Sequence, residues 1–223
     1  MRDKLKKKDY FSTCIEYEKA RIIKFTQALQ SVDKNNLIGI RNANLYLSNF
    51  YRNLFKLKYS AGYPINEIFN DYLAWLNHYK LICSENDSFY DWVDMFSIGV
   101  LYSNNRESFI SSLTDIIEKC KITDGLILLF YDYVKGNRYT FTQSKAYYFE
   151  NLFFAADKHN VVSRVLFDWY NNHKDAYWYD SHKSKNNTYC GYWCFEIGAV
   201  VKVLGIEDSR FKNQVYYPYD LVH

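Results

Sequence analysis

The chain has 223 residues, enough for one large domain or two small ones, and either can bury a core without disulfides or bound metals. Only 8 glycines and 2 prolines occur, which favours long regular elements over many tight turns. The net charge is +3, but residues 1–8 carry +4 of it, so the remainder is nearly neutral and does not resemble a polyanion-binding body.

Apolar residues recur at helical spacing through most of the chain. Gly62 is expected to end the second helix and Pro64 to open the third at its first turn. Within the helix expected over 123–135, the stretch Leu126–Tyr133 is short and almost continuously apolar, so a buried strand is the alternative to a core helix there. The expected helices cover, in order, about 9–29, 35–60, 64–83, 87–102, 105–120, 123–135, 143–157, 160–172 and 188–204.

These elements predict an all-α fold, a helical bundle or array of about eight to ten helices whose two halves share a core. We expect an N-terminal helical region over 1–104 and a C-terminal one over 105–223, although no linker separates them. The tail after Gly205 is expected to be irregular or short helical. The basic arm at residues 1–8 is interpreted as a solvated, frayed terminus, with contact to nucleic acid or an acidic membrane as the alternative.

The five cysteines are an odd number and are scattered, which suits reduced thiols in a cytosol better than a disulfide framework. Residues 1–20 lack the apolar core of a secretory signal, and the most apolar stretch, 125–133, is too short to span a membrane. The sequence therefore predicts a cytoplasmic protein.

The cysteines and histidines form no recognisable metal site. Cys190 and Cys194 lie four apart on an expected helical face with His182 upstream, but they lack the partner set of a zinc site and are interpreted as core residues. The commonest metalloprotease, acyl-transfer and phosphate-binding motifs do not occur. No metal and no cofactor are expected.

Acidic residues leave one enzymatic alternative open. The acids Glu85, Asp87, Asp91 and Asp94 could bind Mg²⁺ in a carboxylate- or metal-dependent all-helical hydrolase, although helix starts favour acids in any case. Residues 85–134 contain nine acids and three bases. Such a segregated negative surface attracts a basic partner, while an ordinary solvated face is the alternative.

Two uncommon motifs stand in the C-terminal part. The first comprises Gly191, Tyr192, Trp193, Phe195 and Glu196, followed by Asp208 and Ser209, and the second comprises Tyr216, Tyr217, Pro218, Asp220 and Leu221. In this order they resemble the C-terminal region of PoNi proteins, and the long helix ending at Gly62 fits the N-terminal region of that family more loosely. The resemblance implies a helical fold and a cytoplasmic immunity protein that binds and neutralises a cognate DNase toxin delivered by a bacterial secretion system, without being an enzyme.

These motif residues are interpreted as mostly structural, with Tyr192, Trp193 and Phe195 as core anchors. Glu196 lies in an apolar helix, so we expect it to bond a tyrosine hydroxyl, a backbone amide of the tail or an arginine. Asp220 is expected to hold the tail similarly. Cys194 and Gly198 stand where the family pattern favours small residues such as alanine, and both are small enough for close helix packing.

The partner expected from this resemblance is a toxin protein, with neither direct nucleic-acid contact nor a membrane. A nuclease binds a polyphosphate and therefore has a basic active site, to which acids can present a phosphate-like surface. Exposed tyrosines beside these acids would anchor the contact. The residues hypothesised to contact the toxin are Asp87, Asp91, Asp94, Glu107, Asp115 and Glu118.

Overall fold

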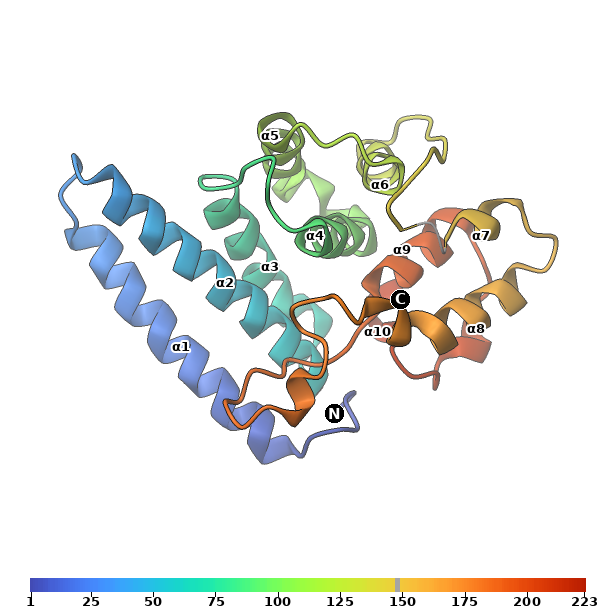
Figure 1. Cartoon of the computed structure of the whole chain (residues 1–223), viewed down its shortest axis with the longest axis horizontal. Helices are drawn as coiled ribbons and strands as arrows, with labels where there is room; N and C mark the ends of the chain where they lie inside the picture. The colour runs from blue at the N-terminus through green and yellow to red at the C-terminus, as the bar shows by residue number, and fades with distance from the viewer. Residues whose placement is uncertain (147–148) are drawn as a thin grey trace. The chain divides into compact units, whose positions relative to one another are not determined.

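A computed structural model describes residues 1–146 and 149–223 (Figure 1). Over these residues it contains helices and no strand, which confirms the predicted all-α array. The chain divides into two compact units. Unit 1 comprises Met1–Ser84 and Asp180–Tyr192, and unit 2 comprises Glu85–Tyr179 and Trp193–His223. The division at residue 105 and the shared core stay predictions.

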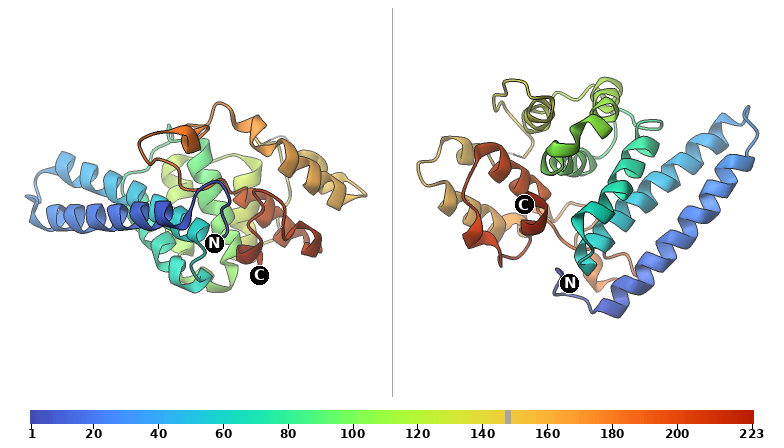
Figure 2. Two further views of the ribbon diagram at one scale, coloured as in Figure 1. Left: turned by 90° about the horizontal axis from the view of Figure 1, so that it is seen from below. Right: turned by 180° about the vertical axis from the view of Figure 1, so that it is seen from behind.

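Unit 1 is built on three long helices, α1 (Lys8–Ser31), α2 (Leu37–Ala61) and α3 (Ile65–Tyr79). The views of Figures 1 and 2 agree that α2 lies between α1 and α3. The side chain of Asn36 caps α2 by accepting from the Gly39 amide at 2.8 Å. Gly62 ends α2 with a φ of 92°, a left-handed conformation that suits glycine, so its expected role is confirmed.

The N-terminal arm, residues 1–7, is docked on the end of α2. Arg2 donates to the carbonyl oxygen of Tyr59 at 2.8 Å, and its guanidinium lies 4.6 Å from the centre of the Tyr59 ring. The buried carboxylate of Asp3 accepts a hydrogen bond from the Tyr189 hydroxyl. The predicted frayed terminus is therefore wrong, because a buried hydroxyl and the last carbonyls of α2 find their partners in this arm.

The 180–192 segment packs against α1 and α2 within unit 1 and contains one short helix, η4 (Ser181–Lys183). The backbone of Tyr189 exchanges two hydrogen bonds with the Tyr10 hydroxyl, at 2.9 and 3.1 Å. Ser60 donates to the carbonyl oxygen of Cys190 at 2.7 Å. The helix predicted over 188–204 consequently begins only at Phe195, and Cys190 does not share a helical face with Cys194.

Unit 2 is organised around α4 (Phe89–Leu101), whose residues 92–101 are all buried. This helix packs against α6 (Gly125–Lys135) and α9 (Phe195–Leu204). Stretch 125–135 is a helix, as favoured over a strand, and the Asp124 carboxylate caps it by accepting from the Leu126 amide at 3.0 Å. The elements of unit 2 are α4 (Phe89–Leu101), η1 (Ser103–Ser108), α5 (Ile110–Cys120), α6 (Gly125–Lys135), α7 (Glu150–Phe154), α8 (Lys158–Trp169), η3 (Asn171–His173), α9 (Phe195–Leu204), η5 (Ser209–Phe211) and α10 (Tyr219–Val222).

Two predicted helices of unit 2 differ from the observed ones. Stretch 105–120 is a 3₁₀ turn followed by α5. Among the described residues of 143–157, α-helix is confined to α7, and residues 147–148 lie outside the described part. The Gly125 amide donates to the Gln143 carbonyl at 3.0 Å and the Lys145 amide to the Asp124 carboxylate at 2.8 Å. These bonds hold residues 143–145 against the start of α6. The tail is short helical, as expected.

Within residues 1–146 and 149–223, no helix is both long and apolar enough to cross a membrane.

Candidate interaction surface

The start of α4 carries two of the acids that the sequence singled out. Asp87 precedes the helix and Asp91 lies in its first turn, and both are half-buried. The Asp91 carboxylate accepts a hydrogen bond from the Tyr177 hydroxyl at 2.9 Å. A carboxylate in this position also interacts favourably with the positive end of the helix dipole.

A second bond of the same kind lies beside the first. The Tyr90 hydroxyl donates to the Asp175 carboxylate at 2.7 Å. In α4 the tyrosine is therefore the donor in one bond and the neighbouring Asp91 is the acceptor in the other, and both partners lie in the loop after η3. We call Tyr90, Asp91, Asp175 and Tyr177 the Tyr–Asp patch. Asp175 is exposed and Tyr177 is 57% exposed, so the patch presents aromatic rings and carboxylates to solvent.

Tyr90 keeps its hydroxyl proton at neutral pH and can therefore donate to Asp175. Burial, and then the neighbouring Asp175 carboxylate, raise the pKa of Tyr90 to about 12. The Tyr90 ring also packs 5.4 Å from the buried ring of His173, which stacks 5.4 Å from Trp178. Since Trp178 follows Tyr177 directly, these ring contacts fix the loop that carries half of the patch.

The other acids in the hypothesised contact set lie elsewhere in unit 2. Asp94 is only 9% exposed, so its carboxylate faces the interior. Glu107 is exposed in η1 and pairs with Arg106 at 3.3 Å. On α5, Asp115 is half-buried and Glu118 is exposed. The structure thus places Asp87 and Asp91 at one end of α4 and separates Asp94 from the surface acids.

Inside unit 2, Asp94 is close enough to Glu196 to act on its titration. Glu196 is 2% exposed and accepts a hydrogen bond from the indole nitrogen of Trp169 at 2.6 Å. Burial raises the pKa of the Glu196 carboxyl, His173 opposes the rise and Asp94 adds to it. Glu196 accepts a hydrogen bond, as expected. Its donor is the indole of Trp169, however, so the expectation of a tyrosine hydroxyl, a tail amide or an arginine was wrong.

A groove of about 840 Å³ lies beside the start of α4, and none of the Tyr–Asp patch residues lines it. Of the four acids considered for a hydrolase, Glu85 lines it and Asp87, Asp91 and Asp94 do not, and Glu85 pairs with Lys121 at 3.1 Å. In the part of the chain that the structure describes, no three His, Cys, Asp or Glu side chains are grouped to hold a metal ion. The remaining lining residues are Asn86, Phe89, Trp92, Cys120, Ile122, Thr123, Asp124, Thr142, Gln143, Ser144 and Lys145.

The tail closes around the buried carboxylate of Asp208. Asp208 is 5% exposed and accepts from the Tyr217 hydroxyl at 2.6 Å and from the ring of His223 at 2.8 Å. The expected tail-holding residue, Asp220, is exposed. A Cβ atom on Gly198 would lie 2.7 Å from the Pro218 ring, so glycine is needed where α9 meets the tail.

The first motif straddles the boundary between the units. Gly191 has a left-handed φ of 104°, and the Tyr192 hydroxyl lies 2.8 Å from the ring of His182, within unit 1. Trp193 is half-buried, while Phe195 is fully buried at the start of α9. The remaining motif residues lie in the tail, where Tyr217, Pro218 and Leu221 are buried, Tyr216 is half-buried and Ser209 is exposed.

Two family models match the chain in sequence order. The model for the N-terminal part of PoNe immunity proteins (PoNi) matches residues 2–112, and the model for their C-terminal part matches 123–221. The chain belongs to the PoNi family. Its two PoNi motifs both fall in the C-terminal match, as does the 180–192 segment that packs in unit 1. No significant match was found to a curated protein or to a solved structure.

Of the four residues of the Tyr–Asp patch, sequence reasoning named only Asp91. Asp175 and Tyr177 lie in a loop, where no helical period marks which side chains are exposed. The available signal was an acid beside the aromatic run Tyr177-Trp-Tyr179. Asp208 was recognised as a motif residue, but its partners come from the tail and could not be read from spacing.

Proposed function

We propose that this PoNi protein binds a cognate PoNe-type DNase toxin, delivered by a bacterial secretion system, in the cytoplasm and blocks DNA cleavage stoichiometrically. It needs no cofactor and catalyses no reaction of its own. The observation that carries this proposal is the family match over residues 2–112 and 123–221.

The Tyr–Asp patch is the surface that fits such a partner best. Asp91 and Asp175 hold their carboxylates in fixed positions through tyrosine hydroxyls, and Asp87 adds a third negative charge at the start of the same helix. A nuclease cleft that binds phosphates is lined by cations, to which such carboxylates are complementary. Tyr177 supplies the aromatic ring that commonly anchors the centre of an interface.

The exposed acids Glu107 and Glu118 and the half-buried Asp115 are proposed as an outer part of the contact. They belong to η1 and α5 of the same unit and contribute to its excess of acids. Rim charges of this kind mainly speed association and change its salt dependence. Asp94 is left out of the contact because its side chain is buried.

The test is calorimetry of the full chain with a PoNe-type nuclease domain, with DNA cleavage followed in parallel. We expect one-to-one binding, a Kd in the nanomolar range of about 1–100 nM, and loss of cleavage at equimolar protein. Absence of binding at micromolar concentrations to every nuclease of this type tested would exclude the proposal.

The patch is tested separately from the function. Asp91→Asn with Asp175→Asn should weaken binding by about 30-fold or more, equivalent to about 2 kcal/mol, because two positioned charges are lost. Glu16→Gln with Glu67→Gln is the matched control, since it removes the same charge from exposed positions of unit 1. Equal effects of the two pairs would assign the binding to another surface while leaving the immunity function intact.

A further inference from the structure

The two units carry opposite charges. Unit 1 contains 16 Lys and Arg against 8 Asp and Glu, whereas unit 2 contains 12 against 17. Their formal net charges are therefore +8 and −5. Opposite fields of this size attract over about a Debye length, roughly 10 Å at 0.1 M salt. Each unit is thus a suitable partner for the other unit of a second chain.

Unit 1 presents a continuous row of rings and cations on the α1–α2 pair. The Arg21 guanidinium lies 3.8 Å from the centre of the Phe50 ring and 5.1 Å from that of Tyr17. Phe25 packs 5.2 Å from Phe50 and 4.9 Å from Tyr46. Tyr17, Arg21 and Phe25 follow each other at intervals of four along α1, which places them on one helix face. We call these five residues the aromatic strip.

The aromatic strip is open to solvent at both ends. Tyr17 is 63% exposed and Tyr46 is 46% exposed, while Phe50 lies buried beneath Arg21. Lys24 is exposed and lies three residues after Arg21, so a second cation borders the strip on the same face. Single exposed apolar residues are ordinary, but a contiguous ring surface bordered by cations is typical of an interaction site.

We propose that the aromatic strip of unit 1 docks on the Tyr–Asp patch of unit 2 in a second copy of this chain. Lys24 and the Arg21 guanidinium, which also pairs with Glu18 at 3.3 Å, meet the carboxylates of Asp91 and Asp175, and tyrosine rings face each other from both sides. The Tyr–Asp patch carries carboxylates beside tyrosine rings, and the strip carries cations beside rings, so the two surfaces are complementary in charge. Because both belong to the same chain, a second copy supplies the partner surface. The association needs no toxin and is independent of the proposed function.

The first experiment measures the mass of the full chain alone by sedimentation velocity over a range of concentrations. At low salt, about 20 mM, the weight-average mass should rise with concentration from the 26.7 kDa of one chain towards twice that value or more. At about 500 mM salt it should return to one chain, because the Debye length falls to about 4 Å. A mass of one chain at every concentration, as an intramolecular contact would give, overturns the proposal.

Complementary variants identify the two surfaces. Lys24→Glu with Tyr17→Ser damages the strip, and Asp175→Lys damages the patch, so each protein alone should stay at one chain. An equimolar mixture of the two should associate again, because the intact patch of the first meets the intact strip of the second. Association by either variant alone, or a mixture that stays monomeric although both variants melt cooperatively, would contradict the assignment.

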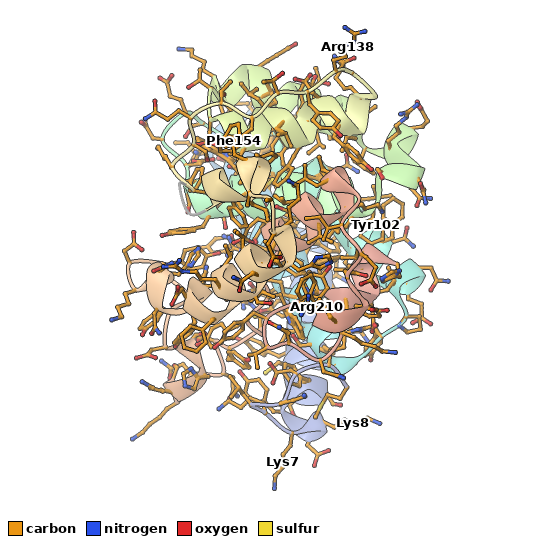
Figure 3. The ribbon with its side chains drawn as sticks, turned by 90° about the vertical axis from the view of Figure 1, so that its right-hand side faces the viewer. Lys7, Lys8, Tyr102, Arg138, Phe154 and Arg210 are labelled. Carbon is orange, nitrogen blue, oxygen red and sulfur yellow. The ribbon has the colours of Figure 1, made fainter. Side chains whose placement is uncertain are left out.

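Lys7→Glu is the matched control for the strip. Figure 3 shows the Lys7 side chain at the start of α1 pointing away from the ribbon. Lys7 lies 17 residues before Lys24, about 25 Å along the helix at about 1.5 Å per residue, and the substitution changes the charge of unit 1 equally. It should associate like the unchanged chain. Loss of association in this control, or strip-dependent binding of a DNA duplex by a chain that never self-associates, would point to general charge or to nucleic acid instead.

Discussion

At the scale of single residues, the buried Glu196 makes stability depend on pH. Its folded-state pKa is raised chiefly by burial, so the folded state holds the proton more tightly than the unfolded chain, whose glutamates titrate near pH ~4.3. The stabilisation from this group is fully present below that value and is lost as pH rises through the folded pKa. The free energy of unfolding therefore contains a component that falls with pH.

Glu196→Gln should remove this component. Glutamine keeps an oxygen for the Trp169 indole, now at 2.6 Å from the carboxylate, but carries no charge to bury. Urea unfolding at pH 5 and pH 8 should show the variant gaining stability relative to the unchanged chain as pH rises. Glu196→Ala is the contrast: it leaves the indole N–H unsatisfied and should cost about 1–3 kcal/mol at pH 5, and less at pH 8, where the unchanged chain has lost the stabilisation from this group. A constant difference between Gln and Glu across pH would contradict the raised pKa.

Gly198 is required by a close approach rather than by the helix. Alanine normally stabilises a helix interior by about 1 kcal/mol relative to glycine, yet its Cβ here would lie 2.7 Å from the Pro218 ring. Gly198→Ala should therefore destabilise by about 1–3 kcal/mol in thermal unfolding. Adding Pro218→Ala removes the obstructing ring carbon and should recover part of the loss. A Gly198→Ala variant as stable as the unchanged chain would show that the tail moves aside freely.

At the scale of elements, the N-terminal arm should hold the 180–192 segment in place. Asp3→Ala leaves the buried Tyr189 hydroxyl without its carboxylate and should cost about 1–3 kcal/mol. Hydrogen exchange should speed up at the amides of residues 189–192 while α3 keeps its protection. Lys4→Ala, an exposed position in the same arm, is the control and should change neither quantity.

The helices that the sequence predicted well are those with local reasons to form. Segments α1, α2 and α3 have apolar stripes at helical spacing, and Gly62 provides a left-handed stop. The predictions that were wrong lie where the backbone forms hydrogen bonds with side chains from distant parts of the sequence. Tyr10 and Ser60 form such bonds with residues 189–190, and Asp124 forms one with the Lys145 amide. Helical periodicity cannot reveal such partners, because they are far away in the sequence.

The candidate site could be predicted from the sequence only in part. A count of acids located Asp87 and Asp91 at the start of α4, because a segregated charge is visible in the sequence. It could not tell that Asp94 faces inward, since its burial depends on packing against α9, nor that a loop brings Asp175 and Tyr177 beside Tyr90. Composition thus indicated the unit, and tertiary structure selected the residues.

At the scale of the whole molecule, the opposite net charges of the two units favour the approach of a basic partner to unit 2. Under the proposed function, a cationic toxin would be attracted by unit 2, with its net charge of −5, and repelled by unit 1, with its net charge of +8. Exposed bases of unit 1 therefore slow association under the proposed function. Lys4→Gln, Lys7→Gln and Lys34→Gln together should raise the association rate constant by about 2–10-fold at low salt and leave the dissociation rate unchanged, as measured by stopped flow. A change confined to the dissociation rate would instead mean that these lysines touch the toxin.

The proposed toxin site and the proposed self-association share the Tyr–Asp patch, so a chain cannot use it for both at once. Binding of the nuclease then competes with binding of a second copy, and by linkage each weakens the other. At low salt the apparent Kd for the toxin should rise as the total concentration of the PoNi chain is raised, and toxin added to associated chains should yield one-to-one complexes. The strip variant Lys24→Glu with Tyr17→Ser should bind toxin with a Kd independent of its own concentration, because its patch stays open. A complex in which toxin is bound while two chains remain associated through the aromatic strip would instead show that the two contacts use different parts of unit 2.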